Sequence, residues 1–299
     1  ATLREIRARW PELPVIMFST LTQRGATATL DALALGASDY VTKPAHAGDP
    51  HRALEAIRDE LAPKIKALAA RRGSRTETPT VARLPQRRSG LRPSLRERVD
   101  VVAIGVSTGG PNALAQLFPR LPASLPVPIV VVQHMPPMFT RILAERLDAT
   151  SAIRVVEAAD GDELAPGGAW IAPGGRHMLV ERAGPSCAIR TTLDPPVHSC
   201  RPAVDPLFRS VVECYGAHVL AVVLTGMGND GSEGAEAVRA AGGQVVVQDE
   251  DSSVVWGMPG SVVMAGLADA VVPLSELHGE ILARLSVGRA AVRVGEGGS

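Results

Sequence analysis

Three polar residues follow apolar, strand-like runs of the chain: Ser107 after the run from Val101, His134 after Val132-Gln133, and Asp230 after Leu224-Thr225. The carboxyl ends of parallel strands meet at one edge of a sheet, so these side chains can converge there. A serine becomes a nucleophile when a base accepts its proton, and an imidazole base needs an acceptor for its other N–H, which a carboxylate supplies. The set predicts acyl-transfer chemistry.

Each of these residues also has an ordinary role without catalysis. Ser107 could cap a helix, His134 could be a hydrogen-bonded imidazole at a strand end, and Asp230 could be a turn residue among glycines. Taken singly these roles are favoured, and taken together within the motifs described below, catalysis is favoured. His177, at the start of a predicted hairpin strand, and His198, in a predicted loop, are alternative bases.

The glycines around Ser107 fit two other kinds of site less well. Gly105-x-Ser107-x-Gly109 matches the nucleophile elbow of α/β-hydrolases, but those enzymes carry their triad in the order Ser, Asp, His, whereas the order here is Ser, His, Asp. A dinucleotide-binding loop would need a full Gly-x-Gly-x-x-Gly, and Ser107 stands where that fingerprint has a glycine. A distinct fold with serine-hydrolase chemistry is therefore preferred.

Residues 99–285 are predicted to form the domain that positions these side chains. Apolar strands alternate with helical segments, and such continuous apolar strands are typical of a parallel sheet covered on both faces. Residues 168–173, 177–181 and 188–192 are interpreted as an antiparallel excursion with a turn at Gly184-Pro185. The predicted fold is a doubly wound, mostly parallel α/β sheet with an antiparallel hairpin insert. Its strands are expected at 101–106, 129–133, 155–157, 220–225, 245–248 and 270–272.

Residues 1–69 form a separate region in the pattern helix, strand, helix, strand, helix. The expected elements are 3–10, 15–18, 26–35, 40–41 and 50–69. Alternation of strands and helices implies a parallel sheet with right-handed crossovers. Two strands make only a marginal sheet, so this region is expected to need support from the other domain.

Composition narrows the class of protein. With 299 residues, 45% of them hydrophobic, the chain is expected to form two domains. Its 31 basic and 31 acidic residues cancel, which argues against nucleic-acid binding or membrane-surface binding by the chain as a whole. No apolar run of about 18 residues and no secretory pattern is seen, and Cys187, Cys200 and Cys214 fit neither disulfide nor zinc spacing. A cytoplasmic protein with reduced thiols is expected.

Residues 70–98 are interpreted as a basic Pro/Arg-rich linker, and residues 286–299 as a flexible tail. Positions 71–98 hold nine arginines against two glutamates, a balance of +7, with prolines, glycines and no apolar period. A solvated tether is favoured over a docking segment, and nucleic-acid binding ranks below both.

The N-terminal region resembles the second half of a response-regulator receiver domain, which has a flavodoxin-like fold. The matching stretches are Pro14–Thr20 and Gly36–Pro44. The resemblance implies that Ser19 contacts a phosphoryl oxygen, Tyr40 is a switch aromatic and Lys43 pairs with the phosphoryl group. The phosphoacceptor aspartate and the acidic metal pair belong to the family's first half, which precedes this chain. We therefore expect no phosphorylation or magnesium binding at that usual site; a histidine kinase would be the partner of an intact receiver.

Residues 99–285 resemble the catalytic domain of the chemotaxis protein-glutamate methylesterases, the CheB family. Six motifs match in order, at 104–111, 132–136, 171–178, 201–205, 224–231 and 248–251. The resemblance implies that Ser107 is the nucleophile, His134 the base and Asp230 its partner. It also places the backbone at Met227 and the amides of the serine loop, which includes Thr108, at the oxyanion site.

This family hydrolyses glutamate γ-methyl esters, and also deamidates glutamines, on the cytoplasmic helices of methyl-accepting chemoreceptors. The resemblance implies the same activity here, without metal or organic cofactor, and implies that an intact receiver covers the site until it is phosphorylated. Two alternatives stay open at this point. One is a regulatory receptor-binding module with a vestigial triad, and the other is a serine esterase acting on small acyl esters.

Overall fold

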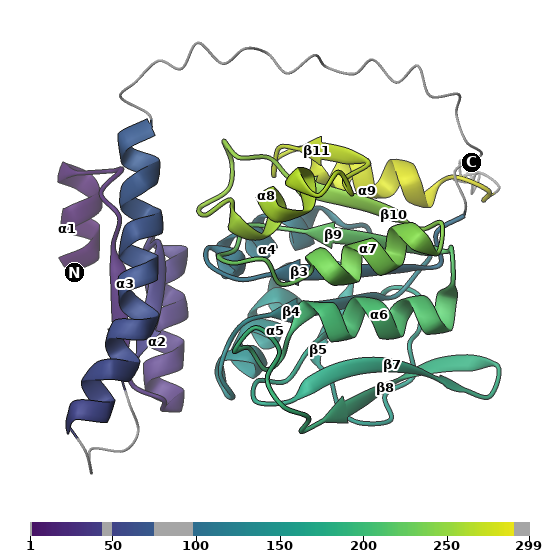
Figure 1. The fold of residues 1–299 in the computed structure, drawn as a ribbon, viewed down its shortest axis with the longest axis horizontal. Coiled ribbons are helices and arrows are strands. Elements are labelled where there is room, and N and C mark those ends of the chain that lie inside the picture. Colours follow the sequence, from purple (N-terminus) through teal and green to yellow (C-terminus); the bar gives the residue numbers. More distant parts are fainter. Residues whose placement is uncertain (1, 44–49, 75–97, 290–299) are drawn as a thin grey trace, which may run out of the picture.

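The computed structural model describes residues 2–43, 50–74 and 98–289 (Figure 1). Its largest unit is a seven-stranded sheet of order β11-β10-β9-β3-β4-β6-β5, and every neighbouring pair in it is parallel. The predicted doubly wound parallel sheet is thus present. The strands are β3 (Val101–Val106), β4 (Ile129–Gln133), β5 (Arg154–Glu157), β6 (Gly168–Ile171), β9 (Val219–Val223), β10 (Gln244–Gln248) and β11 (Ala270–Val272).

Helices bury both faces of this sheet. Along β3, Val102, Ile104 and Val106 belong to one apolar cluster, and Val101 and Ala103 to the other, because successive side chains of a strand point to opposite faces. The first cluster includes residues of α4 (Gly110–Leu117), α5 (Phe139–Thr150) and α9 (Leu277–Leu285). The second includes residues of α6 (Val204–Tyr215), α7 (Ser232–Ala240) and α8 (Gly257–Met264).

The order of the strands creates a crevice at the centre of the sheet. From β3 the chain proceeds to β4, then to the edge strand β5 and back to β6 between them; it later crosses to β9 on the other side of β3 and proceeds outward to β10 and β11. Ligands of open α/β sheets bind where the strand order reverses, at the carboxyl ends of the strands. The segments that follow β3, β4 and β9 therefore lie at the place where this fold class forms its sites.

One predicted strand belongs to a different sheet than expected. Gly168–Ile171 (β6) lies between β4 and β5 and pairs in parallel with both, so the prediction that it begins the antiparallel excursion is wrong. Short apolar strands carry no signal for their partners, and Trp170 and Ile171 are buried as a central strand requires. The antiparallel hairpin consists of β7 (His177–Ala183) and β8 (Ser186–Thr192), and an isolated antiparallel bridge joins Glu163 to Ala188 of β8.

The N-terminal region is a two-stranded parallel sheet with three helices. Its elements are α1 (Thr2–Arg9), β1 (Ile16–Ser19), α2 (Gln23–Ala34), β2 (Asp39–Thr42) and α3 (Pro50–Ser74). In Figure 1 these elements, in purple and blue, lie to one side of the large sheet. The apolar residues of α2 join the same buried cluster as α4 and α5, so the two regions share one core.

Polar and aromatic contacts add to that shared core. The ring of Tyr40 stacks on Phe139 with ring centroids 5.0 Å apart. Arg146 Nη2 donates to Thr27 O at 3.0 Å and lies 2.6 Å from Asp31 Oδ1.

Part of the predicted linker and tail lies outside the described residues. The structure describes the chain through Ser74, where α3 ends, and again from residue 98, so 75–97 of the basic segment and residues 290–299 are not described. None of the helices within the described ranges combines the length and the apolar character needed to cross a bilayer.

Candidate active site

Ser107 and His134 leave adjacent strands at the same level of the sheet. The register pairs Val106 of β3 with Gln133 of β4, and His134 N donates to Val106 O at 3.1 Å. On the other side, Ser107 N donates to Thr225 O, just past β9, at 3.0 Å. Backbone hydrogen bonds from both neighbouring segments thus hold Ser107 at the central crevice.

Two glycines allow the loops around Ser107 to approach closely. Gly109, directly before α4, has φ +80°, a conformation that side-chain-bearing residues rarely adopt. A Cβ on Gly226 would lie 2.9 Å from Ser107 Cβ, so only glycine lets the loop after β9 pass this close. The glycines in both motifs are explained by this packing.

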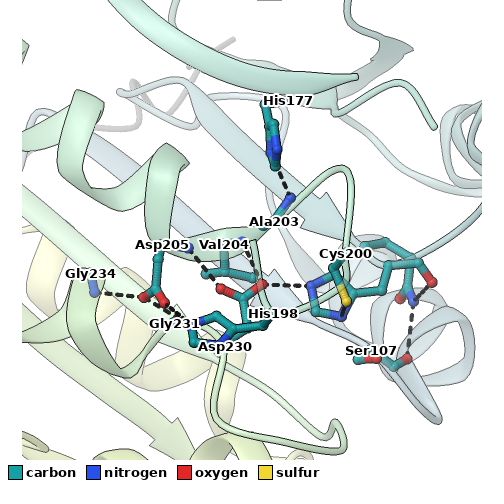
Figure 2. A network of polar contacts seen from close by, with 12 residues as sticks. Ser107, His177, His198, Cys200, Ala203, Val204, Asp205, Asp230, Gly231 and Gly234 are labelled. Carbon is teal, nitrogen blue, oxygen red and sulfur yellow. Dashed lines mark hydrogen bonds and ion pairs between the residues drawn. The ribbon is translucent and has the colours of Figure 1, made fainter. Parts of the chain in front are cut away.

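His134 and Asp230 form the polar pair at the centre of the site, and Figure 2 shows Asp230 with the residues around it. His134 Nε2 lies 2.7 Å from Asp230 Oδ2, and the two side chains are 12% and 3% exposed. An ionised carboxylate only accepts hydrogen bonds, so Nε2 carries the proton. When the imidazole is neutral, Nδ1 therefore has the free lone pair and is the basic nitrogen.

The surroundings of His134 favour its charged form. Burial by itself lowers its pKa, but the hydrogen bond to Asp230 and the contact with Cys200 outweigh burial and raise the pKa to about 9. Asp230 responds in the opposite sense: burial raises its pKa, while the hydrogen bond and positive charge of His134 and amide donors lower it, with a net decrease. The pair thus favours an imidazolium beside a carboxylate.

Asp230 is also fixed by the start of α6. Its Oδ2 accepts from Val204 N at 2.7 Å and its Oδ1 from Asp205 N at 3.0 Å. With the bond from His134, three N–H donors hold this carboxylate, so its orientation toward the imidazole is defined. Nothing in the sequence analysis singled out Asp205, although it lies in one of the matched motifs.

Cys200 is a second neighbour of the imidazole that was not predicted as a site residue. Its Sγ lies 3.6 Å from His134 Nδ1, the basic nitrogen. In the described part of the chain, no hydrogen bond joins the Ser107 hydroxyl to His134, and the Ser107 carbonyl accepts from Gln133 Nε2 at 3.0 Å. Hydrogen bonds between a nucleophile and its base are often formed only when substrate is bound.

A cavity of about 570 Å³ opens above these residues. Ser107, Thr108, His134, Met227 and Asp230 line it from the large sheet. Within the described ranges, the backbone N–H groups of Thr108 and Met227 donate to no protein acceptor. All five residues predicted for the active site are therefore brought together around one cavity.

The other wall of the cavity belongs to the N-terminal region. Tyr40 and Thr42 of β2 and Glu60 and Lys64 of α3 line it. Lys64 Nζ is held there by Tyr40 O at 2.7 Å and by Asp39 Oδ2 at 3.1 Å. This region therefore narrows access to Ser107.

The two alternative bases are occupied elsewhere. His177 is buried, with Nε2 3.1 Å from Pro195 O and Nδ1 accepting from Ala203 N at 3.2 Å, so backbone groups satisfy both ring nitrogens. His198 lines the cavity, but its Nε2 lies 2.9 Å from Asp205 Oδ2. Neither imidazole is paired with Asp230 in the way that His134 is.

The side chains of the three predicted receiver residues have different partners. Ser19 is buried and its Oγ contacts Gly25 O at 3.1 Å and Thr29 Oγ1 at 2.6 Å. Tyr40 stacks on Phe139, as described above. Lys43 is exposed, with Nζ 5.5 Å from the centroid of the Phe18 ring. Ser19 and Thr42 form the last register pair of β1 and β2, and Lys43 N, just past β2, donates to Ser19 O at 2.6 Å.

His198, Asp205 and Asp230 have side-chain atoms within 4.8 Å of one another, a spacing that metal ligands can have. Their carboxylate oxygens, however, already accept from backbone or imidazole N–H groups. Such donors point at the space a cation would fill, so the cluster fits a hydrogen-bond network better than a metal centre.

Comparison with known proteins agrees with this geometry. The family model for the CheB methylesterase matches residues 102–281. The chain is 53% identical over 287 residues to a protein-glutamate methylesterase/protein-glutamine glutaminase of Trichodesmium erythraeum, covering 95% of this chain and 81% of that protein. It is 50% identical over 289 residues to a protein of the same name from Nocardioides sp., covering 95% and 78%.

A solved structure gives the same assignment. The crystal structure of the Thermotoga maritima CheB methylesterase catalytic domain is 43% identical and superimposes with a TM-score of 0.61, covering 62% of this chain and 99% of that one. The matched model spans more than half of the chain and includes Ser107, His134 and Asp230. This chain belongs to the CheB methylesterase family.

Proposed function

We propose that this protein hydrolyses γ-methyl esters of glutamate side chains on chemoreceptors and releases methanol, with deamidation of receptor glutamines as a second activity. The observation that carries the proposal is the pairing of His134 with Asp230 beside Ser107, at the carboxyl end of the central strands. The activity corresponds to the names of the curated relatives. The substrate is the cytoplasmic helical region of such receptors.

In the first half of the reaction, Ser107 Oγ attacks the ester carbonyl while His134 Nδ1 accepts the hydroxyl proton. Asp230 keeps the proton of Nε2 in place and stabilises the imidazolium. The imidazolium then protonates the methoxide oxygen as its bond to the carbonyl carbon breaks; methanol leaves, and the acyl group stays on Ser107 Oγ as an acyl-enzyme. Because Cys200 Sγ faces Nδ1, the thiol must yield this nitrogen to Ser107 for the step to occur.

In the second half, water attacks the acyl-enzyme with His134 again as base, and Ser107 leaves with the proton. The product is a glutamate carboxylate. In both tetrahedral intermediates, the backbone N–H groups at Thr108 and Met227 stabilise the negative oxygen. The start of α4, directly after Ser107, adds the partial positive charge of a helix N-terminus.

The N-terminal wall of the cavity supports a regulatory role for that region. Tyr40, Thr42, Glu60 and Lys64 restrict the approach of a helical substrate to Ser107. Movement of β2 and α3 away from α5 would open the cavity. Ser19, Tyr40 and Lys43 are the residues proposed to couple this movement to a phosphoryl signal from a histidine kinase in a complete receiver.

The test is methanol release from methylated receptor membranes by the wild-type protein and by Ser107→Ala. We expect release by the wild type and a loss of roughly four orders of magnitude or more in the variant. Release of small esters without action on receptors would instead support a general esterase. Receptor binding without methanol release would support a binding module, and equal release by the two proteins would overturn the assignment of Ser107.

A further inference from the structure

The helices α6 and α7 begin with a reciprocal pair of carboxylates. Asp230, just before α7, accepts from Val204 N and Asp205 N at the start of α6, at 2.7 and 3.0 Å. In return, Asp205 Oδ1 accepts from Gly231 N at 3.0 Å and Gly234 N at 2.6 Å at the start of α7. Each carboxylate thus caps the helix that carries the other, as Figure 2 shows.

Asp205 is fully buried, and its second oxygen faces a second histidine. Oδ2 lies 2.9 Å from His198 Nε2, so a His198–Asp205 pair stands beside the His134–Asp230 pair. Burial raises the pKa of Asp205, the bond from Gly234 opposes this, and the charge of Asp230 raises it further, with a net increase. Two neighbouring carboxylates in a buried site need positive charge or N–H donors, and the two helix starts supply those donors.

The turn that carries His198 is held in an uncommon conformation. Val197 and Cys200 exchange backbone hydrogen bonds at 3.1 and 2.8 Å, and the two residues between them have φ +50° (His198) and +61° (Ser199). A tight turn with two positive φ angles normally uses asparagine or glycine. Here it places His198 on Asp205 and, two residues later, Cys200 on His134.

We propose that Asp205 is a positioning residue for the reaction: it fixes Asp230, and through Asp230 the imidazole of His134, with His198 as its own counter-group. The proposal rests on the triad assigned under the proposed function. It has a structural reason in the hydrogen bonds, because loss of the Asp205 acceptors would release Gly231 N and Gly234 N and with them the segment that holds Asp230. It has an electrostatic reason because the Asp205 charge lies beside the His134–Asp230 pair.

The ionisable groups near His134 and Asp205 determine how the titration of His134 depends on Asp205. His134 is in contact with Asp230 and Cys200, and Asp205 with His198 and Asp230. The other ionisable groups among the described residues that line the cavity are Arg201 from the same turn segment, Tyr40 from β2, and Glu60 and Lys64 from α3. Substitution of Asp205 removes one negative charge from this set and leaves the others in place.

The experiment compares Asp205→Asn with Glu233→Gln. Asparagine keeps the size of Asp205 and an oxygen acceptor but loses the charge. Glu233 also links α6 to α7, through Arg209, but on the exposed side of the helices, so Glu233→Gln controls for a merely structural link. At a pH high enough for His134 to be neutral in both proteins, we expect Asp205→Asn to lower kcat for methanol release by about ten- to a hundredfold with little change in KM, since small misplacements of catalytic groups have effects of this size.

A second readout does not depend on turnover. The titration of His134, followed by NMR of the imidazole in a Ser107→Ala background, is expected to move to lower pH in Asp205→Asn and to stay in place in Glu233→Gln. His198→Asn, which tolerates positive φ, is expected to lower kcat in the same direction as Asp205→Asn but less. Thermal unfolding identifies any variant that fails to fold. If Asp205→Asn does not fold, the His134 titration is measured in His198→Asn: a shift supports the role of Asp205, and an unchanged titration contradicts it.

The outcomes separate the two proposals. No methanol release by the wild type would overturn the proposed function. Release by the wild type and none by Ser107→Ala, with kcat and the His134 titration unchanged in Asp205→Asn, would overturn the role of Asp205 alone. Equal losses in Asp205→Asn and Glu233→Gln, with no shift of the titration, would likewise reduce Asp205 to a structural link.

Discussion

The two sheets of this protein differ in how they are stabilised. In the seven-stranded sheet, β3, β4, β9 and β10 are buried along their whole length by helices of the same region. In the two-stranded sheet, β1 is mostly half-buried, Phe18 is 48% exposed, and α2 completes its burial against α4 and α5. The large sheet is self-sufficient, whereas the small one depends on it.

The two regions also contribute differently to the proposed active site: the large sheet carries the triad, and the N-terminal region limits access to it. Every residue of the proposed triad is positioned by backbone hydrogen bonds within the large sheet and its helices. The N-terminal region contributes only the opposite wall of the cavity. The two-stranded sheet adds little stability of its own, so the N-terminal region is suited to dock on the large sheet and to separate from it.

The largest expected effect comes from removal of the base. His134→Ala should lower kcat for methanol release by about four orders of magnitude, because the Ser107 proton then has no acceptor. The N-terminal region should stay docked, which limited proteolysis can show. His218→Gln, at the opposite end of the sheet before β9, is the matched control and should retain activity. Turnover by His134→Ala near that of the wild type would contradict the assignment.

The second prediction concerns pH. The pKa of His134 is raised to about 9, and the imidazole is a base only when neutral, so kcat/KM should increase with pH up to about pH 9. With a pKa of about 9, the neutral fraction of His134 rises about fiftyfold between pH 7 and pH 9, about ninefold in the first unit and about fivefold in the second, and kcat/KM should follow it. Stopped-flow or steady-state methanol assays over this range, corrected for hydrolysis in Ser107→Ala, provide the measurement.

Cys200→Ala sharpens that test. The thiol is one of the groups that raise the pKa of His134, so its removal should shift the rising limb to lower pH and increase kcat/KM at pH 7. Removal also frees Nδ1 for Ser107. A flat pH profile, or a limb that does not move in Cys200→Ala, would show that the charge state of His134 does not govern the reaction.

The third prediction concerns the apolar core that the N-terminal region shares with α4 and α5. Tyr40→Ala removes a buried ring that stacks on Phe139 and should lower the free energy of unfolding by about 3 kcal/mol, as for other buried aromatic rings. It should also widen the cavity and increase kcat/KM toward receptor substrates. Urea unfolding and methanol assays measure the two effects. Tyr40→Phe keeps the ring and should change neither by much.

The smallest effect is expected for the ion pair at the same boundary. Arg146 and Asp31 are 32% and 61% exposed, so their bond should contribute at most about 1 kcal/mol and less at high salt. Asp31→Asn, which leaves the bond from Arg146 to Thr27 O in place, should therefore alter docking slightly in low salt and not in 0.5 M salt, as followed by the rate of proteolysis between the regions. A loss as large as that of Tyr40→Ala would show that charge, rather than the shared core, holds the small sheet.

Much of this fold could be predicted from the sequence because the central strands are unusually clear. The apolar runs Val101–Val106 and Ile129–Gln133 are strands with the predicted bounds. The place of Gly168–Ile171 was missed, since strand pairing depends on tertiary packing rather than on the local pattern. The sequence predicts that the two-stranded region needs support from the other domain, but it does not predict that α2 packs against α4 and α5.

The site divides in the same way. Ser107, His134 and Asp230 could be picked out because strand ends and glycine loops mark them. Asp205 and Cys200 could not, because a carboxylate near a helix start and a single cysteine are common in any chain. Their importance comes from distances across the fold: Cys200 is 66 positions from His134, and Asp205 is 25 from Asp230. A local sequence pattern cannot predict contacts between residues so far apart in the chain.

The most direct test of the central claim is to identify the covalent intermediate. Methylated receptor fragments are mixed with the protein, the reaction is quenched in acid within milliseconds, and the peptide containing Ser107 is analysed by mass spectrometry. Nucleophilic catalysis predicts a glutamyl ester on Ser107 that forms with the methanol burst, decays with turnover and is absent from Ser107→Ala. Methanol release with an unmodified Ser107, or an acyl group on Cys200 instead, would contradict the account.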